Sequence, residues 1–404
     1  MMLLEFSDGL FYIISQIILM IFQSFDDSTQ PFVPSPLHRV NKDGILYEPK
    51  IVNYGTSVIE DVYRIGNATK YHKTDMIVDL LLSRTNAERQ NIKEKYNSVL
   101  RKSLLNENEN IKSNLVYVLF QDLLTDSSNI LGGELNKAVI LSDLKRITSI
   151  LIDFWGEEFN EVEKIYKLSA SESLWNSIGK KFGKSVESVL RCVVETRKIE
   201  PQQEYPVKGR GGKPIVNESV VLKAFNDLMN VSHSNEVKAE QLGEILCKLN
   251  PFEFETLDIV FQRSRLGELN VYTSTDHQEI YPSIFEIFQA KTIGPIHNVL
   301  VALYNYSINK PLYFATIIHD ELHKELTDFL SLQRLLLLRS EIDLHTIDKV
   351  YKTKYGMYLS EDVKKIYVGE YGERLLKLLQ KKEIPDIFQQ AIPVLPPVLQ
   401  SKII

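Results

Sequence analysis

The feature that most constrains this chain is a helical pattern that recurs four times along it. Each copy contains a short amphipathic segment that ends in an aromatic residue, and these residues are Tyr96, Tyr166, Phe261 and Tyr351. Apolar residues around them follow the i, i+3, i+4 spacing of a helix face. One copy is too small to enclose a core, so the copies must pack against one another. The sequence therefore predicts an all-α protein of four repeats.

Charge and cysteine content exclude several classes of protein. The chain has 404 residues, with 47 Lys plus Arg against 53 Asp plus Glu and a net charge of -6. No overall basic field is available to hold nucleic acid, which we do not expect as a partner. The two cysteines, Cys192 and Cys247, each lie in an apolar helical pattern. This favours two buried thiols over a disulfide scaffold or a cysteine-ligated metal.

The amino-terminal region combines an apolar segment with a proline-containing stretch. Leu10 to Phe22 is apolar except for two residues, but it is too short for a transmembrane helix. A secretion signal, an anchor lying in the membrane interface and a misassigned start remain open alternatives. Each of them fits the length of the segment, and none of them fits its flanking charges. Thr29 to His38 carries three prolines and is interpreted as a linker, so we expect the folded part to begin near Ser57.

A second proline- and glycine-rich stretch separates the two halves of the chain. Residues 201–217 include Lys208, Arg210 and Lys213 around a KGRGG segment. This segment lacks the spacing of a phosphate-binding Walker loop, so a solvated basic linker is favoured. The last residues, from about 382, form a proline-rich tail.

In detail, the repeats resemble those of the annexins. Ile77 to Tyr96 (IVDLLLSRTNAERQNIKEKY) resembles the second and third helices of an annexin repeat. Arg339 to Leu344 and Asp348 to Gly356 resemble the last repeat of the family. The resemblance covers roughly residues 57–381. It implies four repeats of four to five short helices each, packed as a curved disc, and a protein that binds acidic phospholipids in a calcium-dependent manner.

This resemblance divides the chain as follows. The segments are an apolar N-terminal part with a proline-containing linker (1–56), repeat 1 (57–125), repeat 2 (126–200), a basic linker (201–217), a divergent repeat 3 with an inserted loop (218–309), repeat 4 (310–381) and a proline-rich tail (382–404). Arg84 and Arg339 each lie at the end of a predicted helix. We expect them to form internal ion pairs or helix-end contacts.

Annexins bind calcium through a Gly-x-Gly-Thr loop in each repeat and an acidic residue roughly forty positions later. Glycines let backbone carbonyls turn towards a hard cation, and the acid supplies charge. The corresponding loops here are Thr69 to His72, Val139 to Ser142, Lys238 to Gln241 and Lys324 to Asp328. The corresponding distant positions are Asn110 or Ile111, Gly179 to Gly183, Lys291 to Gly294, and Ile366. No copy is complete, and only Thr327 and Asp328 remain as a weak remnant.

Calcium is therefore expected from the resemblance only. Acids near these positions are Glu107, Glu109, Glu361 and Asp362. They leave improvised low-affinity sites open, although exposed carboxylates at helix ends are usually just solvated. His319 and His323 lie four residues apart in the order HDELH. A pair of histidines on a helix surface is favoured over a metal site, because the glutamate of an HExxH motif is displaced.

Basic residues gather where the resemblance places the membrane-facing loops. They are Lys70, His72, Lys73, Lys180, Lys181, Lys184, His323 and Lys324. Cations near an anionic surface contribute about 1 kcal/mol each, so several of them would partly replace calcium. The alternative is that these side chains are ordinary solvated residues.

We therefore predict a peripheral membrane protein, not an enzyme, that binds acidic phospholipids with doubtful dependence on calcium. The alternative is a protein-interaction scaffold that keeps the fold and has lost lipid binding. A metal-dependent hydrolase would need both imidazoles and an acid to converge. The resemblance implies a cytoplasmic protein at membranes, or a secreted one if Leu10 to Phe22 belongs to a signal peptide. Protein partners through the N-terminal segment are a further prediction.

Overall fold

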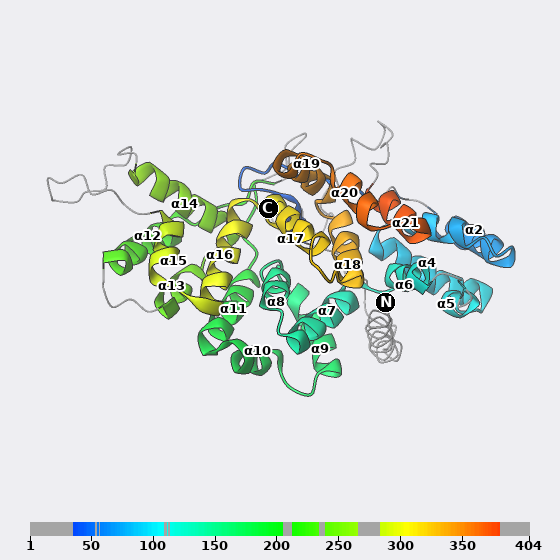
Figure 1. The fold of residues 1–404 in the computed structure, drawn as a ribbon, viewed down its shortest axis with the longest axis horizontal. Coiled ribbons are helices and arrows are strands. Elements are labelled where there is room, and N and C mark those ends of the chain that lie inside the picture. Colours follow the sequence, from blue (N-terminus) through cyan, green and yellow to red (C-terminus); the bar gives the residue numbers. More distant parts are fainter. Residues whose placement is uncertain are drawn as a thin grey trace, which may run out of the picture.

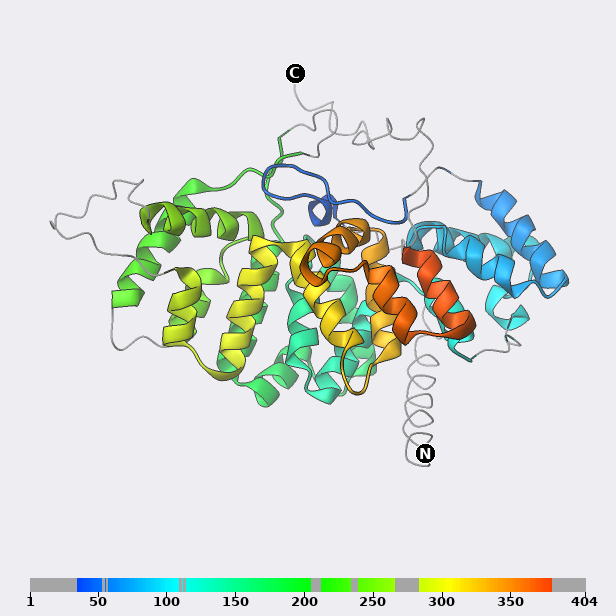
Figure 2. The ribbon, with the colours of Figure 1, turned by 45° about the horizontal axis from the view of Figure 1, so that its top comes forward.

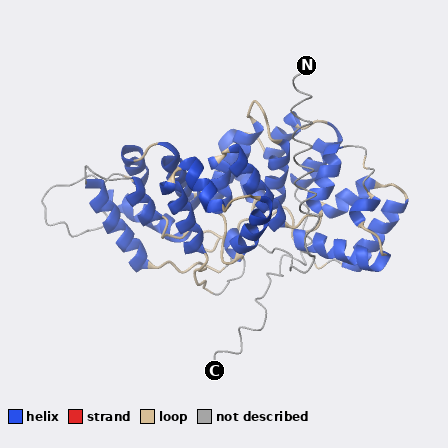
Figure 3. Ribbon diagram, turned by 90° about the horizontal axis from the view of Figure 1, so that it is seen from below, coloured by secondary structure: helices blue, strands red, loops and turns tan. Residues whose placement is uncertain are grey.

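The computed structural model shows an all-helical, curved disc (Figure 1). It describes residues 35–52, 55, 57–108, 111, 114–204, 212–233, 239–265 and 283–379. Figure 3 draws no strand in these ranges, and the only β-type pairings among them are the isolated bridges Val40–Leu46 and Gln203–Pro214. The expected all-α class with four annexin-like repeats is confirmed.

Twenty α-helices follow a short 3-10 helix, η1 (Pro36–Arg39), and form four groups of five in chain order among the described residues. Repeat 1 contains α2 (Val58–Lys70), α3 (Thr74–Leu81), α4 (Asn86–Leu100), α5 (Leu104–Glu107) and α6 (Asn114–Leu123). Repeat 2 contains α7 (Ser127–Leu141), α8 (Leu144–Leu151), α9 (Glu158–Ser169), α10 (Leu174–Phe182) and α11 (Lys184–Arg197).

The second half of the chain has the same arrangement. Repeat 3 contains α12 (Glu218–His233), α13 (Ala239–Leu246), α14 (Pro251–Arg265), α15 (Ile284–Lys291) and α16 (Gly294–Ile308). Repeat 4 contains α17 (Lys310–Leu322), α18 (Phe329–Ser340), α19 (Leu344–Tyr355), α20 (Leu359–Ile366) and α21 (Gly369–Leu379).

The recurring aromatic residues occupy the third helix of each repeat, where they are buried in the core. The Tyr96 hydroxyl donates to Glu107 Oε2 at 2.6 Å, and the Tyr351 hydroxyl donates to Asp362 Oδ2. In repeat 2 the Tyr166 hydroxyl lies 3.5 Å from Ser177 Oγ. Each of these partners lies in the fourth helix, eleven residues after the tyrosine. The aromatic ring therefore fills the repeat, and its hydroxyl ties the third helix to the fourth.

Helix ends follow from local sequence. Thr85 caps α4 through a capping box with Glu88, which satisfies two backbone N–H groups at the start of the helix. Arg84, just before it, donates to both carboxylate oxygens of Asp61 at 2.7 and 2.8 Å. Arg339, near the end of α18, is paired with Asp343 and Asp153. Both arginines thus form internal ion pairs, as expected from the sequence.

The N-terminal segment 35–51 belongs to the folded body, so the expectation that folding begins near Ser57 is wrong. Leu37 and Val40 pack in a buried cluster with Trp155 and Phe252. The buried Lys50 ammonium is 3.0 Å from Asp348 Oδ2. Local periodicity could not show this, because a segment with only one short 3-10 helix buries its apolar residues against distant parts of the chain.

The two cysteines form a disulfide, so the expectation of two free thiols is also wrong. Cys192 of α11 and Cys247, directly after α13, are bonded, with 5.5 Å between their Cα atoms. The bond joins repeats 2 and 3. Each cysteine has an apolar helical context in the sequence, but only the packing of α11 on α13 brings the two sulfur atoms together.

Leu10 to Phe22, the proline-rich tail, Glu109 and part of the inserted loop lie outside the described residues. Among the residues that are described, no helix is both long enough and apolar enough to cross a membrane.

Candidate functional site

The turns after the first and fourth helices of the repeats lie together on one face, which we call the loop face. In repeat 1, Asn108 Nδ2 at the end of α5 is 3.5 Å from Thr69 Oγ1 at the end of α2. Between repeats, Lys145 at the start of α8 donates to Asp320 near the end of α17 at 2.6 Å. In Figure 2 the yellow turn α17–α18 points to the lower edge of the ribbon, and the blue segment 35–51 crosses the upper part.

In repeat 2 a lysine ammonium occupies the junction between the two turns. Lys181, near the end of α10, donates to the Ile140 carbonyl oxygen and to Ser142 Oγ, each at 3.1 Å. Ser142 is the C-cap residue of α7 and has a left-handed backbone. A cation of the protein itself thus bonds the carbonyl at the end of the first helix.

The predicted basic residues are all on the surface near the loop face, and several are already paired. Lys180 is 2.5 Å from Glu172, and Lys184 is 2.6 Å from Glu187. Lys324 donates to Glu321. In repeat 1, the Lys70 ammonium lies 5.6 Å from the ring centre of Tyr71, while His72 and Lys73 are exposed in the α2–α3 turn. The structure therefore spreads these residues over three repeats and does not form one basic cluster.

Exposed apolar side chains mark the tips of the same turns, and sequence reasoning did not identify them. Leu326 in the α17–α18 turn is 78% exposed, and Val368 in the α20–α21 turn is 80% exposed. Ile293, between α15 and α16, is 87% exposed. Tyr71, Met76, Ile140 and Leu141 are also exposed near the turns of repeats 1 and 2. The sequence signal that could have identified them is a single apolar residue within a short turn between two predicted helices.

The weak remnant of the calcium pattern in repeat 4 has structural partners. Asp328 caps α18 by accepting from the Ser331 N–H, and its carboxylate lies 2.7 Å from Lys137 and 3.1 Å from Arg146 of repeat 2. Burial opposes ionisation, but these two cations lower the pKa of Asp328 below its usual value. Thr327 donates to the Lys324 carbonyl at 3.3 Å. Asp328 thus joins repeats 2 and 4.

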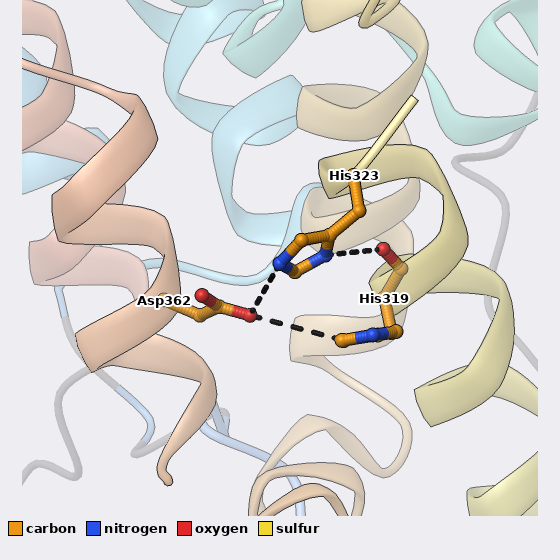
Figure 4. Close-up of side chains that lie close together, drawn as sticks. All are labelled: His319, His323 and Asp362. Atoms are coloured by element: carbon orange, nitrogen blue, oxygen red, sulfur yellow. Dashed lines mark hydrogen bonds and ion pairs between the residues drawn. The ribbon is translucent and has the colours of Figure 1, made fainter. Parts of the chain in front are cut away.

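Two histidines and a carboxylate converge at the end of α17 (Figure 4). His319 lies in the last turn of α17, His323 is the C-cap residue of that helix, and Asp362 comes from α20. Asp362 Oδ2 is 3.6 Å from His323 Nε2 and 3.8 Å from His319 Nδ1. The sequence favoured a solvated histidine pair, whereas the structure adds an acid to it.

Neighbouring groups hold these three side chains in place. The His319 ring stacks on Tyr355 with 3.8 Å between ring centres, and its Nδ1 is 2.8 Å from the Tyr351 hydroxyl. Burial, followed by the nearby His323, lowers the pKa of His319, which favours a neutral imidazole. Asp362 is nearly fully buried, while both histidines reach solvent. Neutral imidazoles beside a carboxylate are groups that can bind a divalent metal.

The structure defines an all-α protein of four packed helical repeats. A family model described as Annexin matches residues 313–378. Annexin B22 of Schistosoma mansoni is 25% identical over 362 residues, which cover 85% of this chain and 95% of the relative. Annexin A10 of Homo sapiens is 24% identical over 324 residues, which cover 79% of this chain and 92% of the relative.

Solved structures have the same fold. A calcium-bound annexin (Sm)1 superimposes with a TM-score of 0.72 at 23% identity, covering 86% of this chain and 97% of that structure. Its apo form has a TM-score of 0.71 at 24% identity, with coverages of 86% and 98%. The chain is thus similar to annexins in sequence over most of its length and has their fold. One of these solved structures contains calcium, so calcium is a ligand to be tested against the residues of this chain.

Proposed function

We propose that this protein binds acidic phospholipid surfaces peripherally through its loop face and that binding does not require calcium. The observation that carries the proposal is the set of exposed apolar tips on that face, above all Leu326, Val368 and Ile293. Single apolar side chains that project from turns can enter the interfacial region of a bilayer, where burial of apolar surface is favourable. The scattered cations around them add attraction to anionic headgroups.

The residues present do not fit the calcium site of the family. A carbonyl cage needs backbone that can turn freely, and the first-helix ends here carry Tyr71, Ser142 and His323 as C-cap residues. In repeat 2 the Lys181 ammonium bonds the Ile140 carbonyl, so a calcium ion would have to displace a positive charge. In repeat 4, Ile366 stands at the expected acidic position. These features support calcium-independent attachment.

We propose a binding role and no catalytic one, which follows from the family and not from the site alone. Protein partners for the N-terminal segment and secretion through Leu10 to Phe22 stay predictions. The scaffold alternative lacks a specific observation in its favour, because apolar tips beside cations suit a lipid surface better than a flat acidic face would. It is kept as an outcome of the experiment.

The test is co-sedimentation of the full chain with phosphatidylserine vesicles and with phosphatidylcholine vesicles. Each is measured in calcium and in chelator, at low and high salt. We expect binding to phosphatidylserine in chelator that weakens with salt. Binding only with calcium would disprove calcium independence, and no binding under any condition would favour the scaffold.

Two variants separate the apolar tips from general surface changes. Leu326→Asp combined with Val368→Asp should weaken vesicle binding at least tenfold, because each change places a charge where an apolar side chain would enter the interface. Ile199→Asp is the matched control, since Ile199 is equally exposed but follows the end of α11, away from the loop face. Equal binding by both variants would contradict the assignment of the loop face.

A further inference from the structure

The geometry points to a binding site for a divalent transition metal, of which Zn²⁺ is the test case. We propose that His319 Nδ1, His323 Nε2 and Asp362 Oδ2 ligate it at the loop face of repeat 4. The site is distinct from the carbonyl loops that the family uses for calcium. The inference does not rest on lipid binding, because it can be tested without any membrane.

The spacing of the three atoms suits a tetrahedral ion. Zinc bonds of about 2.0–2.2 Å at tetrahedral angles place neighbouring ligand atoms about 3.4 Å apart. Here Asp362 Oδ2 is 3.6 Å from His323 Nε2 and 3.8 Å from His319 Nδ1, and the three residues each offer a ligand atom within 4.8 Å of the other two. Small side-chain movements would therefore complete the ligand triangle.

The tautomer of His323 is already set for metal binding. Its Nδ1 lies 2.9 Å from the His319 carbonyl oxygen, which only accepts hydrogen bonds. Nδ1 therefore carries a proton, and in the neutral ring the lone pair of Nε2 faces Asp362. In metal-binding histidines, the ring nitrogen that does not bind the metal usually donates a hydrogen bond of this kind, which fixes the orientation of the ring.

The other two ligands are also positioned by neighbours. Asp362 accepts from the buried Tyr351 hydroxyl, and His319 is held by stacking on Tyr355. When His319 Nδ1 binds the ion, the ring adopts the tautomer with its proton on Nε2, and the contact of Nδ1 with the Tyr351 hydroxyl is exchanged for the metal.

The kind of ion follows from the ligand types. Two imidazoles and one carboxylate favour zinc and similar transition metals, whereas calcium and magnesium prefer oxygen ligands alone. The side chains of His319 and His323 are 28% and 47% exposed, and Asp362 is 5% exposed. The fourth position would consequently face solvent and take water. Lys365 also forms an ion pair with Asp362, but its ammonium is 3.8 Å from Oδ1, which is not the proposed ligand atom.

The test uses the full chain, purified without a histidine tag and treated with chelator. Zn²⁺ is titrated by calorimetry, and Co²⁺ is titrated by following the visible absorption of a tetrahedral site. We expect one tight equivalent, with His323→Gln and Asp362→Asn each weakening the affinity at least tenfold. His72→Gln is the matched control, because His72 is an exposed histidine of the corresponding turn in repeat 1.

His323→Gln decides the outcome even if Asp362→Asn fails to fold, because His323 is exposed and its loss removes little packing. Circular dichroism checks each variant. Equal Zn²⁺ affinity in His323→Gln and in His72→Gln would overturn the proposal and indicate scattered surface binding. Absence of a tight equivalent in the unmodified chain would overturn it as well.

Discussion

Repeats 2 and 4 place different chemistry where the first and fourth helices of the repeat meet. In repeat 2, Ser142 caps the first helix, and Lys181 from the fourth helix bonds its hydroxyl and the Ile140 carbonyl. In repeat 4, His323 caps the first helix, and Asp362 from the fourth helix faces its ring. One repeat thus carries its own cation, while the other presents groups that attract one.

The fold of the repeat determines where the first and fourth helices meet. The side chains at that position determine which ligand can bind there. An ammonium on a carbonyl excludes a metal by charge, whereas two imidazoles beside a carboxylate favour one. The predictions below challenge this comparison, from the largest expected effect to the smallest.

Arg334→Met should have the largest effect, because Arg334 of repeat 4 joins that repeat to Asp122 of repeat 1 and to Glu134 of repeat 2. Its guanidinium is 3.0 Å from Asp122 and 2.7 Å from Glu134 of α7. Removing it leaves two buried carboxylates without their main partner, so we expect a loss of about 3–5 kcal/mol in the free energy of unfolding. Urea denaturation measures it.

Arg64→Met is the control for that variant. Arg64 forms an exposed pair with Glu60 within α2, and such pairs contribute less than about 1 kcal/mol. Equal losses in the two variants would mean that the buried network does not hold repeats 2 and 4 together.

The disulfide distinguishes repeat 2, which it ties to repeat 3, from repeat 4. It closes a loop with a sequence separation of 55 residues. Replacing both cysteines, as Cys192→Ser with Cys247→Ser, should lower the free energy of unfolding by about 2–4 kcal/mol, because the unfolded chain gains freedom. Thermal unfolding with and without reductant measures the same effect. Two reactive thiols in the unreduced, unfolded chain would show that the bond does not form.

Asp328→Asn should remove a pH-dependent part of the stability that links the two repeats. Because Lys137 and Arg146 lower the pKa of Asp328, its contribution is present above the unfolded value of about 3.9 and is lost as pH falls through the lower folded pKa. Asparagine still caps a helix, so mainly the charge is removed. We expect a loss of about 1–3 kcal/mol at neutral pH and a flatter stability profile below pH 5. A profile parallel to that of the unmodified chain would contradict this role.

Lys181→Met should have the smallest effect. Its ammonium is exposed and already bonded to Ile140 and Ser142, so it is less available to a lipid headgroup than Lys73 is. Lys73→Met should weaken vesicle binding in chelator by about fivefold, the equivalent of about 1 kcal/mol, and Lys181→Met by less. Co-sedimentation at low salt measures both. A larger effect of Lys181→Met would show that this ammonium faces the membrane and not the turn.

Much of the fold could be predicted from the sequence, because the helices of each repeat are specified by the spacing of apolar residues that are close in the chain. The aromatic positions and the helical periodicity follow from residues close in the chain. Ion pairs were expected for Arg84 and Arg339, but the partners Asp61 and Asp153 lie 23 and 186 residues away and could not be identified from the sequence. Asp362 was not recognised as a partner of the histidines. The available signal was its place eleven residues after Tyr351, where repeat 1 has Glu107, the partner of Tyr96.

The sequence by itself determined the all-α repeat class, since periodicity and the buried aromatic residue of each repeat act within one helix or its neighbours. Only the tertiary structure decided that Cys192 meets Cys247, that segment 35–51 packs against Trp155, and that Asp362 meets His319 and His323. Each of these contacts joins residues that are far apart in the chain. Their distance depends on how whole helices pack, and no local pattern encodes it.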